Sequence, residues 1–234
     1  MRWNYMANNL AVVIAAAGTG SRMKSDINKQ YILINEKPVL YYSLECFSQM
    51  DLVKELVVVA HPDEVAYCQE NIIDKYQFTK AKVISGGQTR QESVVAGLKS
   101  LNSNVPYVAV HDGARPLVVP SLVLQVLKAA VEHGAAIPAV FATDTMKLID
   151  AAGFVEKTLD RARLIAVQTP QIFNYRELIR AYDLAKEDNF IGTDDASLYE
   201  KYIGKVKTVI SDTSNIKITR PEDIIIAKQL MSKL

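Results

Sequence analysis

One loop combines small residues with positive charge at a spacing suited to a polyphosphate. The apolar run Leu10–Ala17 ends in Gly18-Thr-Gly20, and Arg22, Lys24 and Lys29 follow within one short segment. Glycine lets the backbone turn sharply and bring its N–H groups close to a ligand. Fixed positive charge beside such amides suits phosphate oxygens. These residues indicate a nucleotide-binding loop.

Two familiar phosphate-binding motifs do not fit this loop, whereas a plain turn does. The dinucleotide fingerprint requires a third glycine, which Gly18-Thr-Gly20 lacks. The P-loop requires a Gly-Lys-Ser/Thr ending, which the segment does not have. A glycine turn with solvated basic residues accounts for the loop alone as well as a phosphate site does, so both interpretations stay open.

Asp112 is the candidate metal ligand. It follows the apolar run Tyr107–His111, and Arg115 lies three residues further on. The Asp112 carboxylate could cap the next turn through an Asx bond, or it could bind Mg²⁺ together with phosphate oxygens. Arg115 could hold a phosphate or pair with a carboxylate. The residues alone leave these alternatives open, and a neighbouring triphosphate would favour Mg²⁺ at Asp112.

We expect no nucleophile that is activated by a histidine. Ser43, Ser93 and Thr169 have no evident histidine partner, and His61 and His133 lie at the ends of predicted elements. A phosphate monoester has a second pKa of about 6, so it is largely dianionic at neutral pH and needs no base to attack. The protein would supply alignment for in-line attack and positive charge.

The elements that position these residues alternate between strand and helix. Strands are predicted at 10–17, 55–60, 81–84, 107–111 and 134–143, and helices at 38–50, 64–76, 90–101 and 120–133. Short continuous apolar runs indicate buried parallel strands. The alternation predicts a doubly wound, mostly parallel α/β sheet with right-handed crossovers. Three loops, 18–29, 86–90 and 112–116, follow strands and should meet at the sheet edge where ligands bind.

The stretch 143–173 interrupts this pattern. It contains two predicted strands, 146–150 and 154–159, joined by a turn, and it is poor in large core residues. We expect a protruding β-arm directed toward a partner subunit. Helices at 175–187, 194–202 and 224–234 and a strand at 206–210 then resume the pattern, so residues 1–234 are expected to form a single domain with this arm.

Composition limits the classes of partner and indicates a compartment. Lys and Arg number 27 against 26 Asp and Glu, so there is no overall basic field for nucleic acid. No apolar run reaches the ~20 residues of a membrane span. The N-terminal apolar run resembles a signal peptide, but cleavage after it would delete the first strand, so we expect no signal peptide and interpret residues 1–9 as a ragged leader. With Cys46 and Cys68 interpreted as buried thiols, we expect a soluble cytoplasmic protein.

The first loop resembles that of nucleotidyltransferases which activate sugar or polyol phosphates. Further segments extend the resemblance over nearly the whole chain: GGQTRQES at 86–93, VHDGARP at 110–116, DTMK at 144–147, LDR at 159–161, QTPQIF at 168–173 and NIKITRPED at 215–223. In combination and order they resemble the 2-C-methyl-D-erythritol 4-phosphate cytidylyltransferase family of the non-mevalonate isoprenoid pathway. This resemblance implies a Rossmann-like nucleotidyltransferase fold, CTP and a polyol phosphate as substrates, pyrophosphate as product, and Mg²⁺ as cofactor.

The resemblance implies catalytic and substrate-binding roles for five residues. Arg22 and Lys29 would stabilise the transition state on the triphosphate. Arg161 and Lys217 would position the polyol phosphate, which Thr145 would also contact from the arm. In this family the arm embraces a partner, so the resemblance implies a homodimer with shared sites.

Other residues of the implied site surround the nucleotide. Asp112 would lie near the metal, the nucleotide and the polyol, and Arg115 would contact the substrate. The cytidine nucleotide would be bound by small residues and one serine: Ala16, Ala17, Gly18, Gly20, Gly87 and Ser93. Gln88 stands where some members have an acidic residue, so the resemblance assigns no base or ribose contact to this position.

Two alternatives to this function are retained. The sister family of ribitol-5-phosphate cytidylyltransferases shares the first loop, the Lys29-Gln30 pair and the Thr-Pro-Gln segment. The segments 144–147, 160–161 and 219–222 favour the isoprenoid enzyme over it. A nucleotide-binding regulatory module without turnover would belong to another class, and the full set of basic residues implied for catalysis argues against it.

Overall fold

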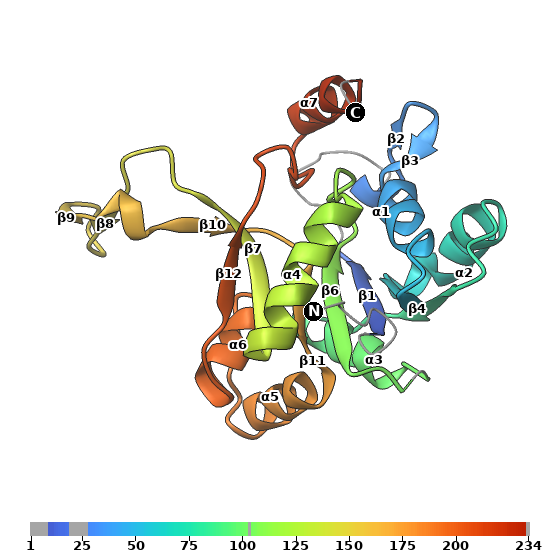
Figure 1. The fold of residues 1–234 in the computed structure, drawn as a ribbon. Coiled ribbons are helices and arrows are strands. Elements are labelled where there is room, and N and C mark those ends of the chain that lie inside the picture. The colour runs from blue at the N-terminus through green and yellow to red at the C-terminus, as the bar shows by residue number, and fades with distance from the viewer. Residues whose placement is uncertain (1–8, 19–27, 103, 233–234) are drawn as a thin grey trace, which may run out of the picture.

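A central sheet organises the chain (Figure 1). The structure is a computed structural model that describes residues 9–18, 28–102 and 104–232. Within these residues the sheet has the strand order β10-β7-β11-β6-β1-β4-β5, and β12 pairs with β7. Its strands are β1 (Leu10–Ala16), β4 (Val53–Ala60), β5 (Ala81–Ser85), β6 (Tyr107–Asp112), β7 (Ala135–Phe141), β10 (Ile165–Val167), β11 (Gln171–Asn174) and β12 (Lys207–Ile210).

Most strand pairs of the central region are parallel. Strand β1 lies between β4 and β6 and is parallel to both, while β5 is parallel to β4 and β12 is parallel to β7. Strand β11 runs antiparallel to both β6 and β7, and β10 runs antiparallel to β7. The predicted α/β fold with a mostly parallel sheet is confirmed.

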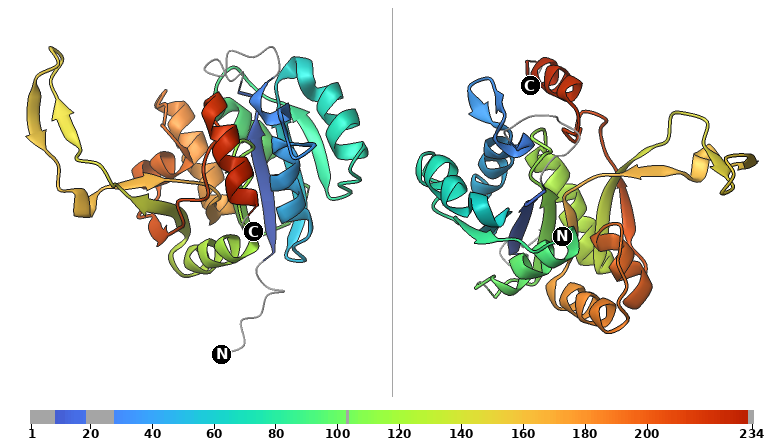
Figure 2. Two further views of the ribbon diagram at one scale, coloured as in Figure 1. Left: turned by 90° about the horizontal axis from the view of Figure 1, so that it is seen from above. Right: turned by 180° about the vertical axis from the view of Figure 1, so that it is seen from behind.

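Helices cover both faces of the sheet (Figures 1 and 2). Alternate residues of β1 face opposite cores, as expected for a strand buried on both sides. Val12 and Ile14 pack with the core under α1 (Val39–Ser48) and α4 (Pro120–His133), whereas Val13 packs with the core of the other face. Helices α3 (Arg90–Lys99), α5 (Tyr175–Glu187) and α6 (Asp195–Tyr202) cover that second face.

Local signals explain where these helices begin. Thr89 caps α3, because its hydroxyl accepts from Glu92 N while the Glu92 side chain accepts from Thr89 N. Proline opens α4 and the C-terminal helix α7 (Pro221–Met231), at a position where its missing N–H costs nothing. The helix expected at 64–76 consists of a 3₁₀ turn, the short α2 (Val65–Cys68) and a wider π-helical stretch, Gln69–Asp74.

A small hairpin before α1 was not predicted. Strands β2 (Leu33–Ile34) and β3 (Lys37–Pro38) are antiparallel, and the turn between them places Asn35 and Glu36 at positive φ. The expected helix start at Pro38 is therefore one residue early, since Pro38 is still extended. Strands of two residues carry too little hydrophobic pattern to be recognised from sequence.

The segment 143–173 divides into an arm and two strands of the main sheet. Its arm is a hairpin of β8 (Lys147–Ile149) and β9 (Val155–Thr158), which are antiparallel and exposed along their full length. Figure 2 shows this hairpin extending away from the body of the protein. Strand β10 and strand β11 join the sheet, and Ile172 and Phe173 of β11 are fully buried in it. The protruding arm is thus confined to the first part of the segment.

None of the described helices combines the length and apolar composition needed to cross a membrane. The longest of them, α4, has 14 residues.

Candidate active site

A cavity of about 500 Å³ opens at the carboxyl ends of β1, β4 and β6. The loops predicted to meet at this edge do so as far as they are described. Ala16–Gly18, the loop Gly86–Arg90 and the loop beginning at Asp112 line it, together with Lys29 and Lys217. Ligands of open α/β sheets bind at such an edge. Arg22, Lys24 and Gly20, which were also predicted for this site, lie outside the described residues.

The loop after β5 is shaped for close backbone approach. A Cβ atom at Gly86 would lie 2.7 Å from Ala17 Cβ, and one at Gly87 would lie 2.5 Å from Glu92 Cβ. Ser93 holds the loop in this form, because its hydroxyl accepts from Gly87 N at 3.1 Å and donates to Thr89 O at 2.9 Å. The two glycines therefore let the loop pack tightly against Ala17 and the first turn of α3, and both line the cavity.

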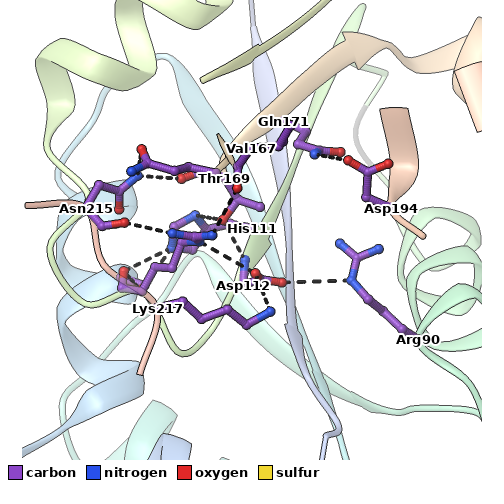
Figure 3. Close-up of polar contacts among 12 residues, drawn as sticks. Arg90, His111, Asp112, Val167, Thr169, Gln171, Asp194, Asn215 and Lys217 are labelled. Atoms are coloured by element: carbon purple, nitrogen blue, oxygen red, sulfur yellow. Dashed lines mark hydrogen bonds and ion pairs between the residues drawn. The ribbon is translucent and has the colours of Figure 1, made fainter. Parts of the chain in front are cut away.

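Asp112 stands at the centre of a cluster of positive charge (Figure 3). Lys217 Nζ lies 2.8 Å from its Oδ2, Arg115 Nε lies 3.6 Å from Oδ2, and Arg90 Nε lies 3.8 Å from Oδ1. Burial raises the pKa of the Asp112 carboxyl, but Lys217, Arg90 and Arg115 outweigh burial and hold the pKa at about 2. The carboxylate is therefore ionised at neutral pH and orients Lys217 at the cavity wall.

Arg115 lies behind Asp112 and is only 9% exposed. Its Nη1 donates to Asn215 O at 2.7 Å, and its Nη2 donates to Val167 O at 3.4 Å. These bonds tie the segment that carries Lys217 to the end of β10. Arg115 is not among the residues that line the cavity, so its predicted substrate contact stays a prediction.

Arg90 is a cavity residue that the sequence prediction missed. It begins α3, and its Nη2 donates to Asp195 Oδ2 at 2.7 Å. Asp195 is fully buried and also accepts from the hydroxyl of Tyr182. Asp195 raises the pKa of the Arg90 guanidinium, which keeps it charged beside the cavity. Its place directly after the glycine loop was the available signal for a site residue.

A buried hydrogen-bond network around His111 supports Asp112 on the side that faces the protein core. His111 contacts the hydroxyls of Ser43 at 3.2 Å and Thr169 at 3.1 Å, so the expectation that neither hydroxyl has a histidine partner was wrong. Burial lowers the pKa of His111 to about 4, so the ring is neutral. Thr169 Oγ1 accepts from Asp112 N at 3.0 Å, which leaves its hydrogen for His111 Nδ1. The network fixes the backbone at Asp112 and is too buried to provide a nucleophile.

The predicted arm residues do not reach this cavity within one chain. Thr145 and Arg161 are exposed and are not among the lining residues. Arg161 Nη1 donates to Thr143 O at 2.7 Å, at the base of the arm. The arm extends from the opposite end of the sheet from β4 and β5 (Figures 1 and 2). One chain therefore brings together Lys29, Lys217 and Asp112, and leaves the arm residues apart.

A metal site built from protein groups alone is not found among the described residues, since no three His, Cys, Asp or Glu side chains cluster there. Asp112 offers one carboxylate. Its Oδ2 is hydrogen-bonded to Lys217, whereas its Oδ1 lies beyond hydrogen-bond distance from Arg90. Mg²⁺ commonly binds through one or two carboxylates plus phosphate oxygens and waters. The donor set therefore fits Mg²⁺ that arrives with a nucleotide.

Comparisons with known proteins agree on one family. A family model described as 2-C-methyl-D-erythritol 4-phosphate cytidylyltransferase matches residues 10–233. Proteins of that name from Caldanaerobacter subterraneus and Clostridium acetobutylicum are 43% and 41% identical to this chain. The first alignment covers 96% of this chain and 100% of the relative, and the second covers 94% and 96%.

Solved structures give the same result. The 4-diphosphocytidyl-2C-methyl-D-erythritol synthase of Anaerococcus prevotii superposes with a TM-score of 0.85 at 31% identity, over 97% of this chain and 99% of that one. The 2-C-methyl-D-erythritol 4-phosphate cytidylyltransferase of Thermus thermophilus superposes with a TM-score of 0.79 at 29% identity, over 96% and 99%.

Proposed function

This chain belongs to the 2-C-methyl-D-erythritol 4-phosphate cytidylyltransferase family, and on that premise we propose that it transfers a cytidylyl group from CTP to 2-C-methyl-D-erythritol 4-phosphate. The reaction releases pyrophosphate and serves isoprenoid precursor synthesis. The observation that carries the proposal is the cavity at the strand ends, where the glycine-loop backbone faces Lys29, Arg90 and Lys217. Backbone N–H groups and fixed cations are the groups that bind a nucleoside triphosphate.

The chemistry needs position and charge from the protein. A phosphate oxygen of the polyol phosphate attacks the α-phosphorus of CTP, and a new P–O bond forms. The bond from that phosphorus to the bridging oxygen breaks, and the electron pair leaves with pyrophosphate. Lys29 and Arg22 stabilise the negative charge that develops on the triphosphate, while Lys217, oriented by Asp112, binds the attacking phosphate. No general base is required, because the attacking oxygen already carries negative charge.

Asp112 would bind Mg²⁺ through Oδ1 together with oxygens of the triphosphate. When bound, the ion supplies positive charge to those oxygens. The protein's own contribution is to keep the Asp112 carboxylate ionised, which Lys217, Arg90 and Arg115 achieve against the effect of burial. Substitution of Asp112 should therefore weaken both the metal contact and the orientation of Lys217.

The active form is proposed to be a homodimer in which the arm of one chain reaches the cavity of the other. Support comes from apolar side chains that the arm exposes: Met146, Leu148, Ile149, Phe154 and Val155. Exposed apolar groups on a protruding hairpin are stabilised by a partner surface. A two-fold axis would bring Thr145 and Arg161 to both cavities in the same way. The free thiols of Cys46 and Cys68 suit a reducing cytoplasm, the proposed location.

The test is pyrophosphate release from CTP with each of two polyol phosphates. We expect rapid, magnesium-dependent release with 2-C-methyl-D-erythritol 4-phosphate and much slower release with ribitol 5-phosphate. Faster release with ribitol 5-phosphate would assign the sister activity. Binding of CTP without release in either case would assign a non-catalytic module. Lys29→Ala serves as the inactive reference, and Lys128→Ala, an exposed change on α4, serves as the matched control.

A further inference from the structure

Glu64 lies beside the cavity, on the 3₁₀ turn Pro62–Glu64 that follows β4. The preceding residues of the same segment, His61 and Pro62, line the cavity. Strand β1 ends next to this turn, because Ala16 pairs with Ala60 in the parallel register. Glu64 therefore lies between the end of β4 and the segment that contains Lys29, which follows β1 in the chain.

Both carboxylate oxygens of Glu64 accept hydrogen bonds from the residues on either side of Lys29. Asn28 Nδ2 donates to Oε1, and Gln30 Nε2 donates to Oε2 at 3.3 Å. Gln30 Nε2 also donates to Ala16 O at 2.8 Å, so both hydrogens of its amide are used. Gln30 is only 2% exposed. These residues belong to the 3₁₀ turn Lys29–Tyr31, here called the Lys29 turn, and its N-cap Asn28. The Glu64 carboxylate thus joins the Lys29 turn to the end of β4, while Gln30 joins it to β1.

The backbone hydrogen bond that closes the Lys29 turn does not involve Glu64. The turn closes through Tyr31 N, which donates to Asn28 O at 2.9 Å. Asn28 occupies the N-cap position of the turn but makes no side-chain cap bond. Asparagine at an N-cap commonly uses its side chain to cap. Here the amide reaches across to a carboxylate 36 residues away, which sets where the turn lies against β4.

Charge alone does not explain a carboxylate at this place. A negative group close to a triphosphate site repels phosphate oxygens. Its neighbour Asp63 is 90% exposed at the side chain and lies 3.6 Å from His61 Nδ1, within its own turn. Glu64, in contrast, is half-buried and bonded to both neighbours of Lys29. Of the two adjacent carboxylates, only that of Glu64 contacts the segment that carries Lys29.

We infer that Glu64 is a positioning residue for Lys29, which it places at the cavity by binding Asn28 and Gln30 together. The inference rests on the proposed role of Lys29 in cytidylyl transfer. Displacement of a reacting group by about 1 Å can lower a rate by ~10². Loss of one of the two hydrogen bonds should therefore lower kcat, while affinity for CTP, which many other groups determine, changes less.

Three variants of the full-length enzyme test the inference through kcat, the KM for CTP and the melting temperature. Glu64→Gln leaves only one acceptor for two amides, and we expect kcat to fall ~10-fold with a smaller change in KM. Adding Asn28→Asp to Glu64→Gln restores both bonds, because the new carboxylate at position 28 accepts from the new amide at position 64, which still accepts from Gln30. This double variant should recover most of the kcat. Asp63→Asn removes the same charge from the same turn and should leave kcat unchanged.

Three results would overturn the inference: full kcat in Glu64→Gln, a loss that Asn28→Asp does not repair, or an equal loss in Asp63→Asn. A kcat and a melting temperature that both fall in Glu64→Gln and both stay low in the double variant would assign Glu64 to folding alone. Failure of the proposed function itself is separate, since it would show as absent pyrophosphate release in the unsubstituted enzyme. A loss of kcat in Lys29→Ala together with full kcat in Glu64→Gln would reject the positioning role of Glu64 and leave the proposed function intact.

Discussion

The cavity and the arm hold their polar residues in opposite ways. In the cavity, Asp112 binds Lys217 at 2.8 Å and Arg90 binds the fully buried Asp195 at 2.7 Å, so other groups of the same chain fix each charge. On the arm, every residue of β8 and β9 is exposed, and Phe154 beside them is 73% exposed. The cavity is therefore preorganised within one chain. The arm residues are packed against other groups only if a second molecule contacts them.

This difference divides the predicted site into two parts. The part proposed to bind the triphosphate is held by the core, and changes there should affect chemistry or stability within one subunit. The part that carries Thr145 and Arg161 should depend on association of subunits. The predictions below test where that division lies.

The largest expected contrast is in stability, between two phenylalanines. Phe173 of β11 is fully buried, so Phe173→Ala should lower the free energy of unfolding by ~3–5 kcal/mol. Phe154→Ala on the arm should leave the fold of each subunit unaffected and weaken association instead. Urea unfolding at several protein concentrations separates the two, because loss of association depends on concentration. A large, concentration-independent loss in Phe154→Ala would place the arm in the core of its own chain.

The next effect is on the rate. Lys29→Ala should lower kcat by ~10²–10³, the usual consequence of losing one preorganised group that stabilises transition-state charge. The protein should keep its melting temperature and its oligomeric state. Steady-state pyrophosphate release measures kcat, with Lys128→Ala as the control. A kcat near that of the unsubstituted enzyme would remove Lys29 from the catalytic machinery.

Acidification should weaken the core through His111. Its pKa is about 4 in the folded protein and ~6.5 when unfolded, so the unfolded state takes up the proton first as pH falls. Stability is fully present above pH ~6.5 and declines toward pH ~4, by up to ~3 kcal/mol. Unfolding free energies across this range measure the slope. His111→Gln should flatten it and His133→Gln, at the exposed end of α4, should not; an equal slope in His111→Gln would contradict the assignment.

The smallest of these effects concerns Asp112. Asp112→Asn removes the charge that orients Lys217, and we expect kcat to fall by ~10–10², as for loss of a hydrogen bond to a charged group. Added Mg²⁺ should restore part of the activity if the carboxylate also binds the ion. The melting temperature should change little. A variant that melts early yet keeps its specific activity would show that Asp112 serves the turn and not the chemistry.

Much of the fold could be predicted from the sequence because the central strands are short, continuous apolar runs. Val12 and Val13 face different cores, and a continuous apolar run is the pattern of a strand buried on both faces. Strand β11 was not predicted, and the assignment of its residues to the arm was wrong. Its pairing between β6 and β7 depends on contacts that are distant in the sequence. The hairpin β2–β3 has strands too short to show any periodicity.

The parts of the site that lie within a single loop could be predicted from the sequence. The parts that depend on contacts between residues far apart in the sequence could not. The loop 86–90 was predicted at the ligand-binding edge of the sheet because it follows a strand, and it does line the cavity. The contacts of Glu64 with Asn28 and Gln30 span more than 30 residues, and those of His111 with Ser43 and Thr169 span 68 and 58. Pairings of this kind arise from the topology of the sheet, so residue type and spacing do not reveal them.

The shared site is the central claim, and mixing two inactive variants tests it most directly. Lys29→Ala damages the cavity and Arg161→Ala damages the arm. If the arm completes the partner's cavity, each mixed dimer has one site with both lesions and one site with neither. Random exchange of equal amounts should then leave about a quarter of all sites intact, with pyrophosphate release recovered in proportion.

If Arg161 serves its own chain, every site in the mixture carries one lesion and mixing restores nothing. Subunit exchange is verified by pull-down of an untagged variant with a tagged one. Exchange with about a quarter of the unsubstituted activity is the predicted result. Exchange with no recovered activity would contradict the shared site.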